Sequence, residues 1–267
     1  MKKIDLSIII VNYNTLDLTA SCIKSILKHS NLNFEIIIIN NYPQSKDPKK
    51  LKNKYKDSRI IIMESPNHGF GAANNLGVEY ARGKYILFLN SDTLVKNNSL
   101  EKMVTFLGRH PEVGALNPLL FHPNGTRQKN YFGDFQTLSS VILRRSSNRL
   151  KKNKKFFYCQ KITGAALMLR KNLFESIGGF DQKFFMYFED EDLCRRIINS
   201  GKKNAIMTTA KIIHLEGKSS STYNKKKMYY QSQDYYWRKH KGLFLEMVMR
   251  TLRFPYLIWQ KLKNKNI

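Results

Sequence analysis

The sequence has few cysteines, few acidic residues and no long hydrophobic run, and each scarcity argues against a class of protein. Its three cysteines, Cys22, Cys159 and Cys194, are scattered without a CxxC pair, which argues against a disulfide framework and indicates a reducing compartment. No stretch approaches the ~18 uncharged apolar residues of a membrane-spanning helix. The first apolar run, Ile8–Val11, is too short for a secretory signal. We therefore expect a cytoplasmic protein.

The scarcity of acidic residues leaves a large positive charge. Twenty Asp and Glu stand against 46 Lys and Arg, a formal net charge of +26. Such a charge predicts an anionic partner, which can be nucleic acid, an anionic membrane or a phosphorylated small molecule, although codon bias toward lysine can also raise it. With 267 residues, 42% of them hydrophobic, the chain is long enough for one large α/β domain or one domain with an appendage.

The first part of the chain alternates between continuous aliphatic runs and segments with helical spacing. This alternation is typical of a parallel sheet with crossover helices. The predicted strands are 6–11, 34–39, 59–63, 84–89 and 205–213, and segments 113–117, 164–169 and 171–177 continue the regular pattern. The predicted helices are 16–27, 69–82, 99–109 and 190–200.

Two segments depart from this rhythm. Residues 121–158, with Arg144-Arg145 and the basic run 151–155, predict an irregular and partly mobile excursion. The last ~50 residues are aromatic and basic without a strand signal. We expect a main domain over 1–220 and a helical C-terminal segment over 221–267.

Polar side chains follow three of the predicted strands where each strand ends. They are Asn12-Tyr13-Asn14, Asn40-Asn41 and Asn90-Ser91-Asp92. A single polar strand ending of this kind is more often a turn, since Asn and Asp are favoured in turns. Three together favour a site, because ligands bind at the carboxyl ends of parallel strands.

Asp92 and His214 are candidate metal ligands. A single carboxylate at a sheet edge can hold Mg²⁺ or Mn²⁺ together with water and substrate phosphates, and the alternative is a turn or helix-capping Asp. His214 follows the predicted strand 205–213. A lone His is more often a packed or surface residue, but at a strand end it is a candidate for metal or phosphate.

Four consecutive acidic residues, Glu189–Asp192, follow the aromatic run Phe184–Phe188. At a helix N-terminus at most one or two of them face any one ligand. A carboxylate in a partly desolvated cleft is a good general base. The alternative is a helix cap paired with Arg195 and Arg196. The glycines and alanines of 67–77 are interpreted as allowing a helix to lie close under a ligand or against the sheet.

In this order the segments resemble the family-2 glycosyltransferases with the GT-A fold, closest to the rhamnosyltransferase-like branch. The resemblance covers about residues 5–220. The matching pieces are SIIIVNYN at 7–14, FEIIIINN at 34–41, NHGFGAANNLG at 67–77, FLNSDT at 88–93, TGAALML at 163–169, GGFDQKFFMYFEDED at 178–192 and the segment 214–219.

The resemblance implies an α/β GT-A fold, with a Rossmann-like mixed and mostly parallel sheet flanked by helices and a C-terminal helical extension. It implies Asp92 and His214 as ligands of Mg²⁺ or Mn²⁺, and Asp190 as catalytic base with Asp192 and Glu189 next in line. The implied nucleotide-sugar contacts are Asn12, Asn14, Asn40, Asn67, Gly69, Asn74, Asn90 and Ser91. This sequence departs from the family where Asn90 replaces the first Asp of the DxD motif and where Asn40 replaces an Asp that contacts the base.

The implied activity is inverting transfer of a sugar from a nucleotide-diphosphate sugar to an acceptor hydroxyl. A dTDP-rhamnose donor is favoured, with UDP- and GDP-linked sugars open, and the acceptor is a glycan or lipid-linked glycan of the bacterial cell surface. Residues 228–267 predict either a helix on an anionic membrane, which makes the enzyme peripheral on the inner face, or a helix packed on the domain. The rival hypotheses are a nucleic-acid-binding protein, which does not predict Asp92 or the acidic cluster, and a non-catalytic sugar-nucleotide-binding relative.

Overall fold

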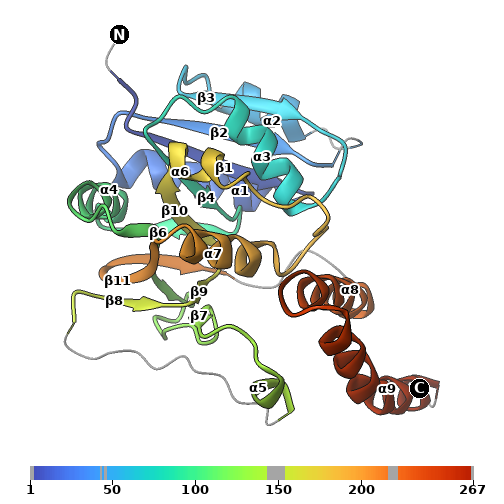
Figure 1. The fold of residues 1–267 in the computed structure, drawn as a ribbon. Coiled ribbons are helices and arrows are strands. Elements are labelled where there is room, and N and C mark those ends of the chain that lie inside the picture. Colours follow the sequence, from blue (N-terminus) through green and yellow to red (C-terminus); the bar gives the residue numbers. More distant parts are fainter. Residues whose placement is uncertain (1–2, 43, 45–46, 143–153, 216–221, 266–267) are drawn as a thin grey trace.

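The computed structural model describes residues 3–42, 44, 47–142, 154–215 and 222–265. A central sheet with the strand order β3-β2-β1-β4-β10-β6-β11-β5 runs through the molecule, and β8 pairs with β11 (Figure 1). The strands are β1 (Leu6–Asn12), β2 (Phe34–Asn40), β3 (Ile60–Glu64), β4 (Tyr85–Leu89), β5 (Thr93–Val95), β6 (Val113–Phe121), β7 (Phe132–Gly133), β8 (Phe156–Cys159), β9 (Lys161–Ile162), β10 (Ala166–Arg170) and β11 (Lys203–His214). The helices are α1 (Leu16–His29), α2 (Asp47–Lys54), α3 (Phe70–Glu79), α4 (Ser99–Arg109), α5 (Leu138–Ile142), α6 (Lys171–Ser176), α7 (Glu189–Asn199), α8 (Thr222–Lys241) and α9 (Leu243–Lys265).

The sheet is mixed and mostly parallel, which confirms the predicted fold class. Strand β1 pairs in parallel with β2 and β4, β2 with β3, and β6 with β11. Strand β10 runs antiparallel between β4 and β6, so it reverses one strand within an otherwise parallel core. The carboxyl ends of β1 and β4 therefore meet at one edge.

Continuous aliphatic sequence explains why the first strands lie in the middle of the sheet. Every residue of β2 and β4 is buried, and Ile8, Ile9 and Ile10 of β1 have no exposed surface. Strands covered on both faces need apolar side chains on both. Helix α3 lies very close to β1, because a Cβ added at Gly77 would come within 2.5 Å of Ile9 Cγ2. Only glycine permits that approach.

Strand β6 continues past residue 117, where the predicted segment ends. It can do so because Pro118 is tolerated within it. Proline has no backbone N–H for a sheet ladder and is confined to edges and bulges. Here Pro118 pairs with Met207, where the register of β11 shifts before resuming at Lys211 opposite Leu119. The bulge in β11 accommodates the proline.

The expected irregular excursion is partly regular. Between residues 121 and 158 the structure has β7, the short helix α5 and most of β8, and β7 pairs with β9 in a separate two-stranded sheet. These strands are too short for the alternation that predicts a strand from sequence. Arg144, Arg145 and residues 151–153 lie outside the described residues.

The C-terminal helix α8 packs on the rest of the protein through a second hydrophobic cluster. Its core consists of Phe184, Phe188, Tyr236, Trp237 and Met249. Within the described part of the chain no helix combines the length and apolarity needed to cross a membrane. The aromatic residues of α8 therefore pack on the domain, as in the second of the two predicted alternatives. Helix α9 extends away from the domain beyond α8 (Figure 1).

Candidate active site

A cavity of about 1070 Å³ opens where β1 and β4 end and α7 begins. Tyr13 lines it beyond β1, Asn90, Ser91 and Asp92 line it beyond β4, and Asp190 lines it from α7. Ligand sites for small molecules occupy about 300–1,000 Å³, so this cavity is large enough for an extended ligand. Its position at the carboxyl ends of parallel strands is the position predicted from sequence.

Asp92 and His214 lie together although 121 residues separate them in the chain. Strand β5 pairs antiparallel with β11, which places His214 opposite Thr93. The Leu215 N–H donates to the Asp92 carbonyl at 2.9 Å, and His214 Nε2 lies 3.3 Å from Asp92 Oδ1. Strand β5, unforeseen in the sequence, is therefore the element that assembles this pair.

The orientation of His214 is fixed by Gln128, a buried residue that sequence reasoning missed. Nδ1 of His214 lies 3.1 Å from Gln128 Oε1, and Gln128 Nε2 donates to the His214 carbonyl at 2.8 Å. An Oε1 atom can only accept, so Nδ1 carries the proton and Nε2 is left with a lone pair. Asn90 Nδ2, a donor, lies 3.4 Å from Nε2, which agrees with this tautomer. A ring held in this way presents Nε2 as a ligand atom.

The Asp92–His214 pair fits a hard divalent cation that takes its remaining ligands from elsewhere. Two neighbouring ligands of an octahedral ion, each at ~2.1 Å, lie roughly 3 Å apart, close to the Oδ1–Nε2 separation. The side chains keep 16% and 12% of their surface exposed, and both line the cavity. Among the described residues no cluster of three or more His, Cys, Asp or Glu could hold a metal. Substrate oxygens and water would therefore complete the coordination.

One loop joins this pair to Asp190. The Asn90 N–H donates to the Ala165 carbonyl at 3.0 Å, and the neighbouring Gly164 N–H donates to Asp190 Oδ2 at 2.9 Å. Both loop residues precede β10, which pairs antiparallel with β4. The sheet thus holds the base candidate and the metal-ligand candidates on one cavity.

The segment before α7 has an unusual backbone. Tyr187 and Phe188 have φ of 71° and 67°, in the left-handed region that large residues avoid. Such conformations cost on the order of 1–3 kcal/mol each and persist where the surroundings hold them. Gly69 contributes to this, because a Cβ there would lie 2.3 Å from the Phe185 carbonyl oxygen, which accepts from the Phe70 N–H. The turn aims the first residues of α7 into the cavity.

The carboxyls of Asp190 and Glu189 both resist ionisation. Burial raises the pKa of Asp190 above its ordinary value and Glu191 adds to the rise, while the Gly164 N–H and the Lys161 charge oppose it. Burial and the neighbouring Asp190 raise the pKa of Glu189 to about 8. Glu189 Oε2 is buried without a hydrogen-bond partner, which is consistent with a neutral acid. Glu189 is therefore protonated at neutral pH.

The Glu189→Gln substitution is expected to stabilise the protein in alkaline solution. The folded state raises the Glu189 pKa, so its favourable contribution is complete below pH 4.5 and is lost as the pH rises through about 8. An amide has no such dependence. We expect a Tm at least ~3 °C above wild type at pH 9 and no such gain at pH 5. An equal Tm difference at both pH values, measured by calorimetry, would contradict the raised pKa.

Asp192 belongs to a different environment from Asp190. Its fully buried carboxylate contacts His240 Nε2 and Lys239 Nζ, each at 2.7 Å, and Arg196. Burial opposes ionisation, but the His240 hydrogen bond and the charges of Arg196 and Lys239 outweigh it and lower the Asp192 pKa to about 2. Asp192 does not line the cavity and instead joins α7 to α8.

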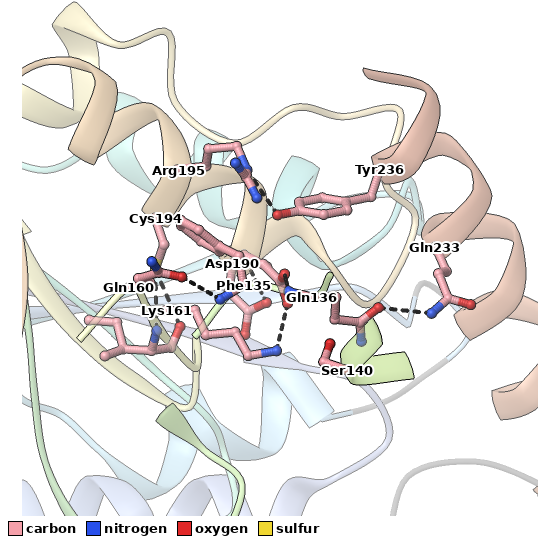
Figure 2. Close-up of polar contacts among 12 residues, drawn as sticks. Phe135, Gln136, Ser140, Gln160, Lys161, Asp190, Cys194, Arg195, Gln233 and Tyr236 are labelled. Carbon is pink, nitrogen blue, oxygen red and sulfur yellow. Dashed lines mark hydrogen bonds and ion pairs between the residues drawn. The ribbon is translucent and has the colours of Figure 1, made fainter. Parts of the chain in front are cut away.

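Two further contacts attach α8 beside the cavity (Figure 2). Arg195 Nε donates to the Tyr236 hydroxyl at 3.0 Å, and Gln233 Nε2 donates to Gln136 Oε1 at 2.9 Å. Lys161 in turn forms a 2.8 Å ion pair with Glu191. Polar contacts therefore fix the positions of the residues around Asp190, the candidate base.

The predicted nucleotide-binding residues divide into two groups. Asn67, Gly69, Asn90 and Ser91 line the cavity. Asn12, Asn14, Asn40 and Asn74 do not. Asn12 Nδ2 donates to Asn40 Oδ1 at 2.8 Å, Asn40 Nδ2 donates to the Tyr42 carbonyl, and Asn74 Nδ2 donates to the Phe70 carbonyl. The amides of Asn12, Asn40 and Asn74 are buried and bonded within the protein, and Asn14 is an exposed residue with φ of 54°.

Asn41 lines the cavity at this edge, although only its neighbour Asn40 is predicted as a nucleotide contact. It is 3% exposed, and its Nδ2 donates to Asn67 Oδ1 at 2.9 Å. Its Oδ1 is buried without a hydrogen-bond partner. Buried polar atoms are nearly always bonded, so this oxygen is a candidate acceptor for a ligand N–H.

Comparison with known proteins gives a consistent result. Residues 7–178 match glycosyl transferase family 2, and residues 144–218 match the N-terminal domain of galactosyltransferase. The O-antigen biosynthesis protein RfbC of Myxococcus xanthus is 27% identical over 225 residues, which is 80% of this chain and 17% of RfbC. The rhamnosyltransferase WbbL of Escherichia coli K12 is 30% identical over 162 residues, 55% of this chain and 61% of WbbL. The chain thus spans less than two thirds of either relative.

The fold is also found among solved structures. GalNAc-T7, solved with UDP, GalNAc and Mn²⁺, superposes with a TM-score of 0.65 at 16% identity. The match covers 89% of this chain and 51% of that protein. This likeness shows the fold, which is GT-A.

Proposed function

The chain belongs to glycosyltransferase family 2, and on this premise we propose that it transfers a sugar from a nucleotide-diphosphate sugar to an acceptor hydroxyl with inversion. The observation that carries this proposal is the shared cavity. Asp92, His214 and Asp190 line it together, and the 164–165 loop is hydrogen-bonded to both sides. A leaving-group site and a general base are the two parts that a single displacement requires.

In the proposed reaction Asp190 accepts the proton of the acceptor hydroxyl. The acceptor oxygen forms a bond to the anomeric carbon from the face opposite the diphosphate, and the bond from that carbon to the diphosphate oxygen breaks. Asp92 and His214 Nε2 would hold Mg²⁺ or Mn²⁺, whose charge offsets the negative charge that grows on the diphosphate. Mn²⁺ in the related GalNAc-T7 structure supports this assignment.

Asp190 is favoured as the base over its two acidic neighbours. Glu189, with a pKa of about 8, carries a proton at neutral pH and cannot accept another. Asp192 is ionised, but its carboxylate is fully buried and held by Arg196, Lys239 and His240 outside the cavity. Asp190 has a raised pKa and two backbone N–H donors, from Gly164 and Glu191, that keep it oriented. A base with a pKa raised toward the working pH is the more effective proton acceptor.

The donor base is proposed to bind between Tyr13 and Asn41. Tyr13 is 40% exposed, lines the cavity and stacks edge-on against Tyr42, so its ring can cover a base. The unpaired Asn41 Oδ1 can accept the imino N–H of thymine or uracil. It would replace the acidic contact that Asn40 cannot supply, since the Asn40 amide is bonded to Asn12 and Tyr42. The rhamnosyltransferase name of WbbL supports dTDP-rhamnose as the donor.

Thermal shift with nucleotides tests the donor assignment. We expect dTDP and dTDP-rhamnose to raise the Tm by several degrees, and only with Mn²⁺ or Mg²⁺ present, because saturation at 100 times Kd adds about 2.7 kcal/mol. UDP and GDP serve as the matched comparison. Stabilisation by GDP alone would contradict the assignment to a pyrimidine donor. Absence of stabilisation by any nucleoside diphosphate would contradict the transferase proposal.

The acceptor is proposed to be a glycan or lipid-linked glycan of the cell envelope. The O-antigen biosynthesis role named for RfbC supports this class. A lipid-linked acceptor would explain the net charge of +26, because anionic membrane attracts basic protein surfaces. The protein would then work in the cytoplasm as a peripheral enzyme at the inner membrane face.

A further inference from the structure

Helix α9 carries an exposed apolar face. Leu243, Phe244, Met247 and Phe254 are 56%, 72%, 51% and 62% exposed. At about 100° per residue these side chains fall within an arc of ~100°. On the other side of the helix Met249 is buried and Leu245 is partly buried, and both pack in the cluster with Tyr236 and Trp237, while Leu252 on that side is 51% exposed. We call the four exposed residues the outer face of α9.

The outer face is held by a well-packed support. Glu246, which is almost fully buried, accepts from Arg238 Nε at 2.6 Å, and Arg253 forms an ion pair with Asp234 at 2.5 Å. Both pairs join α9 to α8. Since α8 packs against Phe184 and Phe188, the outer face is connected to the turn that precedes Asp190. The helix that carries these four exposed side chains is therefore itself packed against the protein.

Exposed basic side chains belong to the same helix pair. Arg250 and Arg238 are 59% and 56% exposed while pairing with Glu246, and Lys241 lies in the last turn of α8. The acidic residue of α9 nearest to them, Glu246, is buried and paired. Apolar side chains flanked by Lys and Arg are the pattern of a helix that lies in the interface of an anionic bilayer.

We propose that the outer face of α9 inserts into an anionic membrane surface and holds the cavity next to it. This inference rests on the proposed transfer to a lipid-linked acceptor. It explains how an acceptor held in the membrane would reach the cavity. Residues Lys225, Met228 and Tyr229 of α8 line the cavity, while the C-terminal half of α8 carries α9. A single helix of 20 residues, ~30 Å long, therefore connects the active site with the membrane contact.

A second copy of the chain is a poorer occupant of this face. Two molecules that each carry +26 repel one another, whereas anionic lipid attracts both. Stable dimers also bury about 1,200–2,000 Å² with complementary shapes, which four side chains on one helix do not supply. A bilayer needs no complementary shape.

Vesicle flotation of the full chain tests the proposal. We expect wild type to float with phosphatidylcholine vesicles that contain phosphatidylglycerol, to float poorly with phosphatidylcholine alone, and to lose binding as salt is raised. The triple variant Phe244→Ser, Met247→Ser, Phe254→Ser is expected to bind anionic vesicles at least ~10-fold more weakly, because three apolar side chains no longer leave water. The matched control is Tyr80→Ser, which removes a 42% exposed ring just beyond α3, outside the α8–α9 unit.

Two readouts separate this inference from the proposed function. Metal-dependent donor hydrolysis in solution and the circular dichroism spectrum are expected to be the same in the triple variant and wild type. Equal vesicle binding by the triple variant, or no binding by wild type to either vesicle, would overturn the inference and leave the transferase proposal standing. Light scattering that shows a wild-type dimer, abolished in the triple variant, would overturn it in favour of self-association.

Discussion

The Asp190→Asn variant is expected to transfer sugar at least ~10²-fold more slowly than wild type, the lower range for loss of a positioned acid–base group. The amide keeps the shape of the carboxyl but cannot accept the acceptor proton. Each Asp190 oxygen accepts from a backbone N–H, so the amide, whose Nδ2 cannot accept, loses one of these two bonds, and circular dichroism checks that the variant folds. The measurement is initial transfer rate together with donor affinity, which we expect to stay within ~3-fold.

The pH profile gives this prediction a second readout. A base must be ionised to act, so kcat/KM rises with pH through the Asp190 pKa, which is raised above the ordinary value for Asp. This rise of kcat/KM with pH is expected to disappear in the Asp190→Asn variant. The control is Asp57→Asn, which alters a surface carboxylate paired with Arg59 far along the sheet at β3. Near-normal transfer by Asp190→Asn would assign the proton transfer to another group, with Glu189 first in line because loss of the Asp190 charge lowers the Glu189 pKa.

The Asp92→Asn variant has the second largest expected effect, a loss of ~10²-fold or more in transfer and a marked loss of Mn²⁺ affinity. Asn90 already replaces one acidic residue of this motif, so Asp92 supplies the negative charge beyond β4. Removing that charge leaves His214 Nε2 with a neutral amide oxygen 3.3 Å away at best. Calorimetry of Mn²⁺ with nucleoside diphosphate would measure the loss directly.

The outcome for Asp92→Asn distinguishes two roles for this residue. If Asp92 only orients His214, the Asp92→Asn variant should keep the wild-type affinity for Mn²⁺ with nucleoside diphosphate. If Asp92 holds the ion, that affinity should fall together with the transfer rate. Transfer by Asp92→Asn at the wild-type rate, with unchanged dependence on Mn²⁺, would show that the cation binds elsewhere.

The predictable parts of the fold are those where apolar runs are long. Strands β1, β2 and β4 are continuous aliphatic segments buried on both faces, and helix α4 spans residues 99–109 as predicted. Strands β5, β7 and β9 have only two or three residues, too few for any periodic signal. Strand β10 follows the expected segment, but its reversed direction depends on tertiary pairing with β4 and β6.

The residues of the candidate site also divide into those that could be predicted from the sequence and those that could not. Asp92, His214 and Asp190 could be proposed because their residue types at strand and helix ends are unusual in a basic chain, and the structure brings them to one cavity. Gln128 could not be singled out, since an isolated polar residue becomes meaningful only when its partner is known. Asn41 belongs to the polar strand ending Asn40-Asn41, where nothing in the sequence favours it over Asn40. Asn12 and Asn40 have the expected residue type, but their buried amides bond to one another. Sequence shows where polar residues stand, and only packing decides which of them remain available to a ligand.

The most direct test of the proposed transfer is the release of nucleoside diphosphate from dTDP-, UDP- and GDP-linked sugars, measured with and without Mn²⁺ or Mg²⁺. We expect that one donor, with dTDP-rhamnose favoured, is turned over only with the cation, and that EDTA, Asp92→Asn and Asp190→Asn each suppress the release. Release that persists equally in EDTA and in both variants would contradict a reaction centred on the cavity shared by Asp92, His214 and Asp190.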